Sequence, residues 1–98
     1  MDTDDLSDET YDAVILTAEK FNHDLTLWFG CLAYKCKNEA EYLLKAEEWI
    51  NDCLEDEDMD FLMEDLFFGN PPREKNFKNT LLNIMKNIER IKNDKRDK

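Results

Sequence analysis

The sequence predicts an all-α fold, a small bundle of about four helices formed by a single domain over residues 1–98. Two observations lead to this prediction. The 98 residues are 42% apolar, which is enough to build one core, and only two glycines and two prolines interrupt the chain. The apolar residues also recur in steps of three and four, which is the period of a helix face. The expected helices cover roughly residues 8–37, 39–54, 58–68 and 73–93.

The first predicted helix begins after Ser7, whose hydroxyl can cap free N–H groups ahead of the acidic residues Asp8 and Glu9. From there a stripe typical of a buried helix face follows: Tyr11, Val14, Ala18, Phe21, Leu25, Trp28 and Leu32. The helix could therefore reach Lys37. A break near residues 22–24 is the open alternative, and the two halves would then use different faces for one core.

The second predicted helix, 39–54, has the clearest start in the chain. Asn38 stands at the cap position and Glu41 follows three residues later, which is the arrangement of a capping box. Its apolar face is expected to lie against the first helix, so that the two elements form an antiparallel pair.

The third predicted helix, 58–68, is short and apolar on one side, and Gly69 follows where helices commonly end. Two prolines then break the chain before the fourth helix, 73–93. That helix carries its apolar side chains in steps of four and three at Phe77, Leu81, Ile84, Ile88 and Ile91. The acidic residues 1–6 are expected to be disordered, and the charged tail 94–98 to be frayed.

Charge is divided unequally along the chain, whose net charge is −11. Residues 1–69 hold 20 acidic and 4 basic side chains, net −16, whereas residues 70–98 hold 4 acidic and 9 basic ones, net +5. The simplest interpretation is complementarity within the chain together with solubility. The functional interpretation is that the acidic surface attracts a basic protein, as small acidic inhibitors, immunity proteins and antitoxins can do.

The sequence indicates a cytoplasmic protein without membrane contact. Its first residues are acidic, where a secretory signal needs positive charge followed by an apolar run, and 18 consecutive apolar residues occur nowhere. The three cysteines form an odd set in a chain without an export signal, which suits reduced thiols better than disulfides.

The stretch "DEDMDFLMEDLF" partly fits a calcium-binding loop. Asp56, Asp58 and Asp60 take the first, third and fifth ligand positions of that loop. However, Phe61 stands where the sharp turn needs glycine, and Phe67 stands where a bidentate glutamate should close the site. We therefore expect the aspartates to favour a helix start instead, with Asp58 or Asp60 at the N-cap.

No metal site, cofactor or catalytic site is expected. The possible zinc ligands lack the paired spacing of zinc sites: His23, Cys31, Cys36 and Cys53. On one helix, Cys31 and Cys36 would point about 140° apart. The only serine is already used as a cap, and the only histidine has no cysteine one turn away, so nucleophilic catalysis is not supported.

A second stripe lies nearly opposite the buried one on the first predicted helix, at Leu16, His23, Leu27, Gly30 and Tyr34. A helix that is apolar on two sides is either central in its own fold or half of an interface. Gly30 costs a helix about 1 kcal/mol relative to alanine, which is easier to understand if another backbone or ring packs there. The stripe is the candidate interface, unless the chain breaks at 22–24 and His23 is only a loop or core residue.

The predicted function is that of a small acidic helical protein that acts through protein contacts, of the inhibitor, immunity or adaptor type. It would bind a basic partner or form a homodimer. The candidate acidic partner surface consists of Glu55, Asp56, Glu57, Asp58 and Asp60. The alternative is a nucleic-acid-associated regulator that uses Lys75, Lys86 and Arg90 of the basic last helix. Direct nucleic-acid binding is disfavoured, because the acidic body repels a polyanion.

Overall fold

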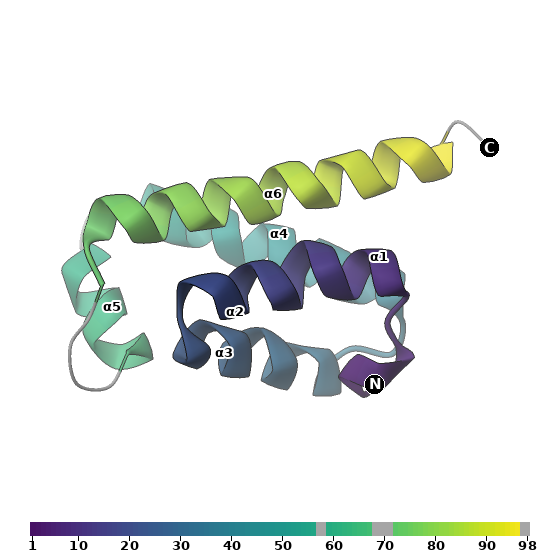
Figure 1. The fold of residues 1–98 in the computed structure, drawn as a ribbon, viewed down its shortest axis with the longest axis horizontal. Coiled ribbons are helices and arrows are strands. Elements are labelled where there is room, and N and C mark those ends of the chain that lie inside the picture. The colour runs from purple at the N-terminus through teal and green to yellow at the C-terminus, as the bar shows by residue number, and fades with distance from the viewer. Residues whose placement is uncertain (57–58, 68–71, 97–98) are drawn as a thin grey trace.

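The structure is a computed structural model that describes residues 1–56, 59–67 and 72–96, with side chains at all of these positions except 60, 95 and 96. The described residues are almost entirely helical and include no strand, so the all-α prediction is confirmed. In chain order the elements are a 3-10 helix Thr3–Asp5, α1 Asp8–Thr10, a π-helix Tyr11–Leu16, α2 Thr17–Phe21, α3 His23–Tyr34, α4 Glu39–Glu55, α5 Met59–Leu66 and α6 Glu74–Arg96 (Figure 1).

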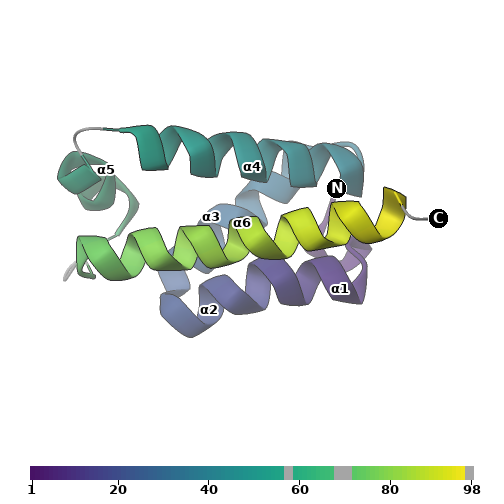
Figure 2. The ribbon, with the colours of Figure 1, turned by 90° about the horizontal axis from the view of Figure 1, so that it is seen from above.

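The helices form a bundle that measures 41 × 24 × 21 Å. α1, the π-helix and α2 follow one another as one continuous segment, 8–21, and this segment and α4 lie along opposite sides of α6 (Figure 2). α3 lies beneath them and contacts both the segment 8–21 and α4. The short α5 closes one end of the bundle, where it contacts α3, α4 and α6.

The first predicted helix, 8–37, is broken at Asn22, in agreement with the alternative of a break near residues 22–24. Asn22 has an extended backbone with φ −163° and ψ 138°, and its side-chain oxygen accepts a hydrogen bond of 2.8 Å from the backbone N–H of Asp24. Asn22 is therefore the N-cap of α3. The chain reverses there, so that α3 runs antiparallel to the segment 8–21 and α4 runs antiparallel to α3 (Figure 1).

Two of the predicted helix starts form as expected. The N–H of Thr10 donates to the hydroxyl of Ser7 at 3.3 Å, and the N–H of Glu41 donates to the side chain of Asn38 at 2.9 Å. The reciprocal bond of the second cap forms one residue earlier than predicted, because the Glu41 carboxylate accepts from the N–H of Lys37 at 3.3 Å. Residue 58, the side chain of residue 60 and residue 69 lie outside the described part, and so do the caps predicted there.

Both chain ends carry more structure than the sequence suggested. The residues 1–6, predicted to be disordered, include the 3-10 helix and the buried side chain of Leu6. The amino group of Met1 also donates to the carbonyl of Cys36 at 2.9 Å. Burial of Leu6 and this hydrogen bond therefore hold in place a segment in which three of the six residues are acidic. At the other end α6 continues to Arg96, past the predicted end at 93, and residues 97 and 98 lie outside the described part.

The core combines predicted and unpredicted side chains. All five apolar residues of the α6 stripe are buried, as its spacing predicted, and so are Val14, Ala18 and Leu25 of the first stripe. Phe29 and Ala33 are also fully buried, although they lie off that stripe. The reason is that the chain reverses at Asn22, which lets α3 present its own face to the core.

None of the helices within the described ranges has the length and the apolar content that crossing a bilayer requires.

Candidate functional site

An apolar face of α3 is exposed to solvent. Leu27 is 53% exposed and Tyr34 is 67% exposed, and Cys31 between them is exposed as well. These residues follow at steps of four and three, so they project from one side of the helix. We call Leu27 and Cys31 the α3 ridge, because a groove lies on each side of them.

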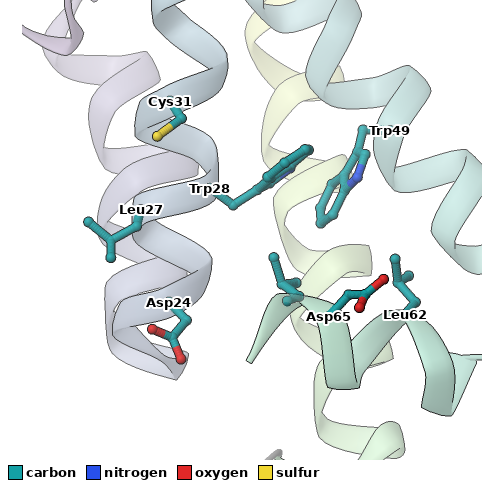
Figure 3. A pocket seen from close by; sticks show the side chains of 8 residues that line it. Asp24, Leu27, Trp28, Cys31, Trp49, Leu62 and Asp65 are labelled. Carbon is teal, nitrogen blue, oxygen red and sulfur yellow. The ribbon is translucent and has the colours of Figure 1, made fainter. Parts of the chain in front are cut away.

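The first groove, which we call the tryptophan groove, lies between α3, α4 and α5 and has a volume of about 330 Å³. It is open to solvent, and most of its surface is apolar. Its lining residues are Asp24, Leu27, Trp28, Cys31, Trp49, Leu62, Asp65 and Leu66 (Figure 3). The volume lies at the lower end of the range of roughly 300–1,000 Å³ that is common for binding sites in proteins.

Two indole rings face each other in the tryptophan groove. The ring centroids of Trp28 and Trp49 are 5.1 Å apart (Figure 3). The buried ring of Phe29 packs edge-on against Trp49 at 5.4 Å. The indole N–H of Trp28 is buried without a hydrogen-bond partner among the described residues. Packing therefore fixes the Trp28 ring in this position, together with the ammonium group of Lys35 at 5.8 Å from its centroid.

The second groove, which we call the tyrosine groove, lies on the other side of the α3 ridge and has a volume of about 270 Å³. Its lining residues are Thr3, Tyr11, Ile15, Thr26, Leu27, Gly30, Cys31 and Tyr34. A Cβ atom added at Gly30 would meet only the Cγ2 of Thr3, at 3.9 Å, which is an ordinary contact. Packing within the chain therefore does not require glycine at this position.

The structure brings together three of the five residues of the predicted interface. Leu27, Gly30 and Tyr34 line the tyrosine groove. Leu16 is half-buried at the end of the π-helix, and the reversal at Asn22 places it on a different helical segment. His23 is the first residue of α3; it is exposed, so it is not a core residue, and it lines neither groove.

Sequence reasoning missed the tryptophan groove itself. The periodicity of the sequence places Trp28 in the buried stripe of the first predicted helix and predicts only that the third helix is apolar on one side. The available signal was that both tryptophans of the chain lie near the middle of consecutive antiparallel helices. Residues at such positions can meet when the two helices pack side by side.

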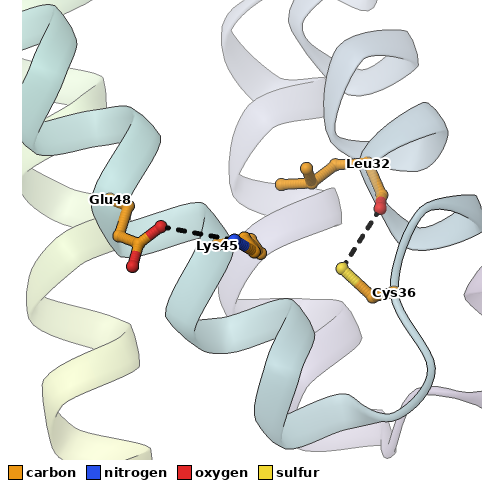
Figure 4. Close-up of polar contacts among 4 residues, drawn as sticks. All are labelled: Leu32, Cys36, Lys45 and Glu48. Carbon is orange, nitrogen blue, oxygen red and sulfur yellow. Dashed lines mark hydrogen bonds and ion pairs between the residues drawn. The ribbon is translucent and has the colours of Figure 1, made fainter.

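The tryptophan groove is electrically polarised. The carboxylates of Asp24 and Asp65 line it near α5. Lys35 lies toward the other end of α3, about 16 Å further along the helix at a rise of 1.5 Å per residue. Lys45, on the α4 turn that precedes Trp49, lies toward the same end and forms an exposed ion pair of 3.7 Å with Glu48 (Figure 4). The groove is therefore acidic at its α5 end, whereas Lys35 lies over the Trp28 ring toward the other end without lining the groove.

The predicted acidic partner surface is only partly described. Glu55 ends α4 and Asp56 follows it, and both residues are exposed. Glu57, Asp58 and the side chain of Asp60 lie outside the described residues.

The four residues considered as zinc ligands differ in their exposure to solvent. His23 and Cys31 are exposed, while Cys36 and Cys53 are buried. The thiol of Cys36 donates to the carbonyl of Leu32 at 3.3 Å (Figure 4). Among the described residues no three histidine, cysteine, aspartate or glutamate side chains could hold a metal ion together.

Both buried thiols are held in their protonated form. Burial, and after it the charges of Asp52 and Asp56, raises the pKa of Cys53 to about 12. Burial, and after it the Glu41 carboxylate, also raises the pKa of Cys36. Protonated thiols are poor nucleophiles and poor metal ligands.

The basic side chains considered for nucleic-acid binding lie on α6. Lys75, Lys86 and Arg90 are exposed there. Other cations of α6 form ion pairs, Lys78 with Glu74 at 3.2 Å and Lys92 with Glu47 at 2.9 Å.

Asn87 joins this surface of α6 to the segment 8–21. Its side-chain N–H group donates to the carbonyl of Ala13 in the π-helix at 3.1 Å and to the hydroxyl of Thr17 at 3.4 Å. Its side-chain oxygen accepts from the guanidinium of Arg90 at 3.5 Å.

The chain matches no protein-family model, no curated protein and no solved structure.

Proposed function

We propose that this protein acts without catalysis by binding another protein, as an inhibitor, immunity protein or adaptor does, and that its partner is basic. The observation that carries the proposal is the α3 ridge with a groove on each side, exposed beside acidic side chains. Contiguous apolar surface of this kind is typical of a protein interaction site, because leaving it in water is unfavourable.

Charge favours a different protein over a second copy of this chain. Each copy carries a net charge of −11, so two copies would repel each other as they approach. A basic protein would instead be attracted, and the attraction would weaken as salt screens it. The same acidic body disfavours DNA and RNA, whose phosphates would approach a chain with net charge −16 over residues 1–69.

The three cysteines are unpaired in the structure. Free thiols suit a reducing compartment, which supports the cytoplasm as the place where the protein acts.

The test compares two variants that remove a leucine and add the same charge. Leu27→Glu changes the α3 ridge, whereas Leu44→Glu changes an α4 residue that lines neither groove. The two leucines are 53% and 47% exposed, so both variants should keep their circular dichroism spectrum. Each protein is used to capture partners from a lysate, and mass spectrometry identifies what is captured. The partners of interest bind the wild-type protein and Leu44→Glu but do not bind Leu27→Glu.

We expect the captured protein to be basic and to be released as salt rises from low to physiological concentration. Equal capture by both variants, or an affinity that does not change with salt, would contradict the proposal. Sedimentation of the purified protein tests the homodimer, which would show twice the chain mass and return to a monomer with Leu27→Glu. Retention of nucleic acid that depends on Lys75, Lys86 and Arg90 would support the regulator instead.

A further inference from the structure

We infer that the tryptophan groove is a docking site for a basic amphipathic helix of a partner protein. An apolar side chain of that helix packs on the indoles of Trp28 and Trp49, and its lysine or arginine side chains lie beside Asp24 and Asp65. This inference rests on the proposed function and names both the part of the molecule that binds and the chemistry of what it binds.

The shape of the site favours a helix as the occupant. Leu27 and Cys31 are one turn apart and form a ridge that separates two grooves. Helices pack by fitting the ridges of one into the grooves of the other, so the side-chain rows of a second helix can lie on both sides of this ridge. The distance of about 16 Å between Asp24 and Lys35 along α3 corresponds to about three turns of such a helix.

The apolar lining of the groove selects the contacting side of that helix. Leu62 and Leu66 of α5 face the groove from one side, and the α3 ridge borders it on the other. Trp28 and Trp49 lie between them, where an inserted leucine, methionine or phenylalanine would contact both rings (Figure 3). Tryptophan is enriched among the residues that contribute most to protein interfaces.

Charge selects the polar side of the same helix. The carboxylates at the α5 end favour lysine or arginine flanking the inserted apolar residue, and Lys35 at the other end favours an acidic or neutral one.

A second copy of this chain does not offer such a helix. Its basic element is α6, and the apolar stripe of α6 is already buried in its own core, at Phe77, Leu81, Ile84, Ile88 and Ile91. Among the described residues, the exposed side of α6 offers one large apolar side chain, Leu82 at 45% exposed, rather than an apolar row, and the net charge of −11 on each copy opposes their approach. The occupant is therefore a helix of a different protein.

The chain carries its own probe for the test. Both of its tryptophans line this groove, so tryptophan fluorescence reports directly on whether the groove is occupied. The probe ligand is a synthetic peptide of 18 residues that contains leucine and lysine only, with the leucines spaced to form one helix face. One control peptide has the same composition in an order without an apolar face, and another replaces lysine by glutamate. We expect a saturable change of tryptophan fluorescence with the first peptide and none with either control.

Two neighbouring charge reversals locate the binding site. Asp65→Lys changes a carboxylate that lines the groove, whereas Glu64→Lys makes the same change at an exposed neighbour that does not. At about 0.1 M salt, where charges act over about 10 Å, we expect Asp65→Lys to weaken peptide binding about ten-fold and Glu64→Lys about two-fold or less. Circular dichroism verifies that both variants fold, and Asp65→Asn replaces Asp65→Lys if the latter does not.

Several results would overturn the inference. They are equal binding of the permuted peptide, equal weakening by the two reversals, and heat of binding without a change in tryptophan fluorescence. If the free protein sediments as a dimer and the Leu62→Glu variant sediments as a monomer, the groove is occupied by a second copy of this chain. If a lysate partner depends on Leu27 while the peptide fails to bind, the docking inference is wrong and the proposed function stands. If both fail, the proposed function fails as well.

Discussion

Replacing Gly30 by alanine should make this protein more stable. Gly30 lies in the interior of α3, where glycine is less favourable than alanine by about 1 kcal/mol. The new methyl group would meet only the Cγ2 of Thr3, at 3.9 Å, so no clash offsets this gain. We therefore expect the free energy of unfolding to rise by about 1 kcal/mol, which raises the melting temperature of a domain of this size by roughly 4–8 °C.

The assay is urea denaturation and thermal melting followed by circular dichroism at 222 nm. Thr3→Ser, made alone and together with Gly30→Ala, removes the one contacting methyl group and completes a double-mutant cycle. The expected coupling is close to zero, since 3.9 Å is an ordinary van der Waals distance. An unchanged or lowered stability of Gly30→Ala would refute the reasoning, and a large coupling would show that the 3-10 helix presses on α3 more tightly than the structure indicates.

Four further predictions concern stability and reactivity. Tyr42→Phe removes the buried hydrogen bond of 3.0 Å from the tyrosine hydroxyl to the carbonyl of Phe29. It should lower the free energy of unfolding, measured by urea denaturation, by about 1 kcal/mol. The control Tyr34→Phe, at an exposed position, should leave it unchanged. A thiol reagent should modify one cysteine of the native protein, Cys31, and all three after unfolding. The fold raises the pKa of the Cys53 thiol from 9.0 to about 12. The protonated thiol therefore contributes fully to stability below pH 9, and this contribution is lost as pH rises toward 12. The free energy of unfolding should fall over that range, and it should fall less in Cys53→Ala. Millimolar calcium should leave the melting temperature unchanged, and a rise of several degrees that magnesium does not produce would restore the calcium-loop interpretation.

Helix type, several helix starts and much of the core could be predicted from the sequence, because each depends on residues within a few positions of one another. Ser7 and Asn38 cap helices because their side chains reach N–H groups three residues later. The α6 stripe is buried because its spacing matches the helical period, whichever neighbours it meets. The acidic character of the surface is equally a property of composition.

The reversal at Asn22 could not be predicted from the spacing of nearby residues, because it depends on contacts between residues that lie far apart in the sequence. The apolar stripe continues across Asn22, so its periodicity alone fits either one long helix or two. In the folded chain Phe21 packs against Phe67 at 6.1 Å and Phe77 at 6.2 Å, and those two rings lie 5.4 Å apart. This three-ring cluster joins the end of α2 to the end of α5 and to α6, whose residues lie more than 40 positions away in the sequence.

The candidate site divides in the same way. The exposed face of Leu27, Gly30 and Tyr34 was predictable, since residues three and four apart share one side of a helix. The tryptophan groove was not predictable, because it exists only where α4 brings Trp49 to Trp28 and α5 adds Leu62 and Asp65. Helical periodicity fixes which side chains of one helix point the same way, whereas packing between distant helices fixes which of those sides meet and which remain open to a partner.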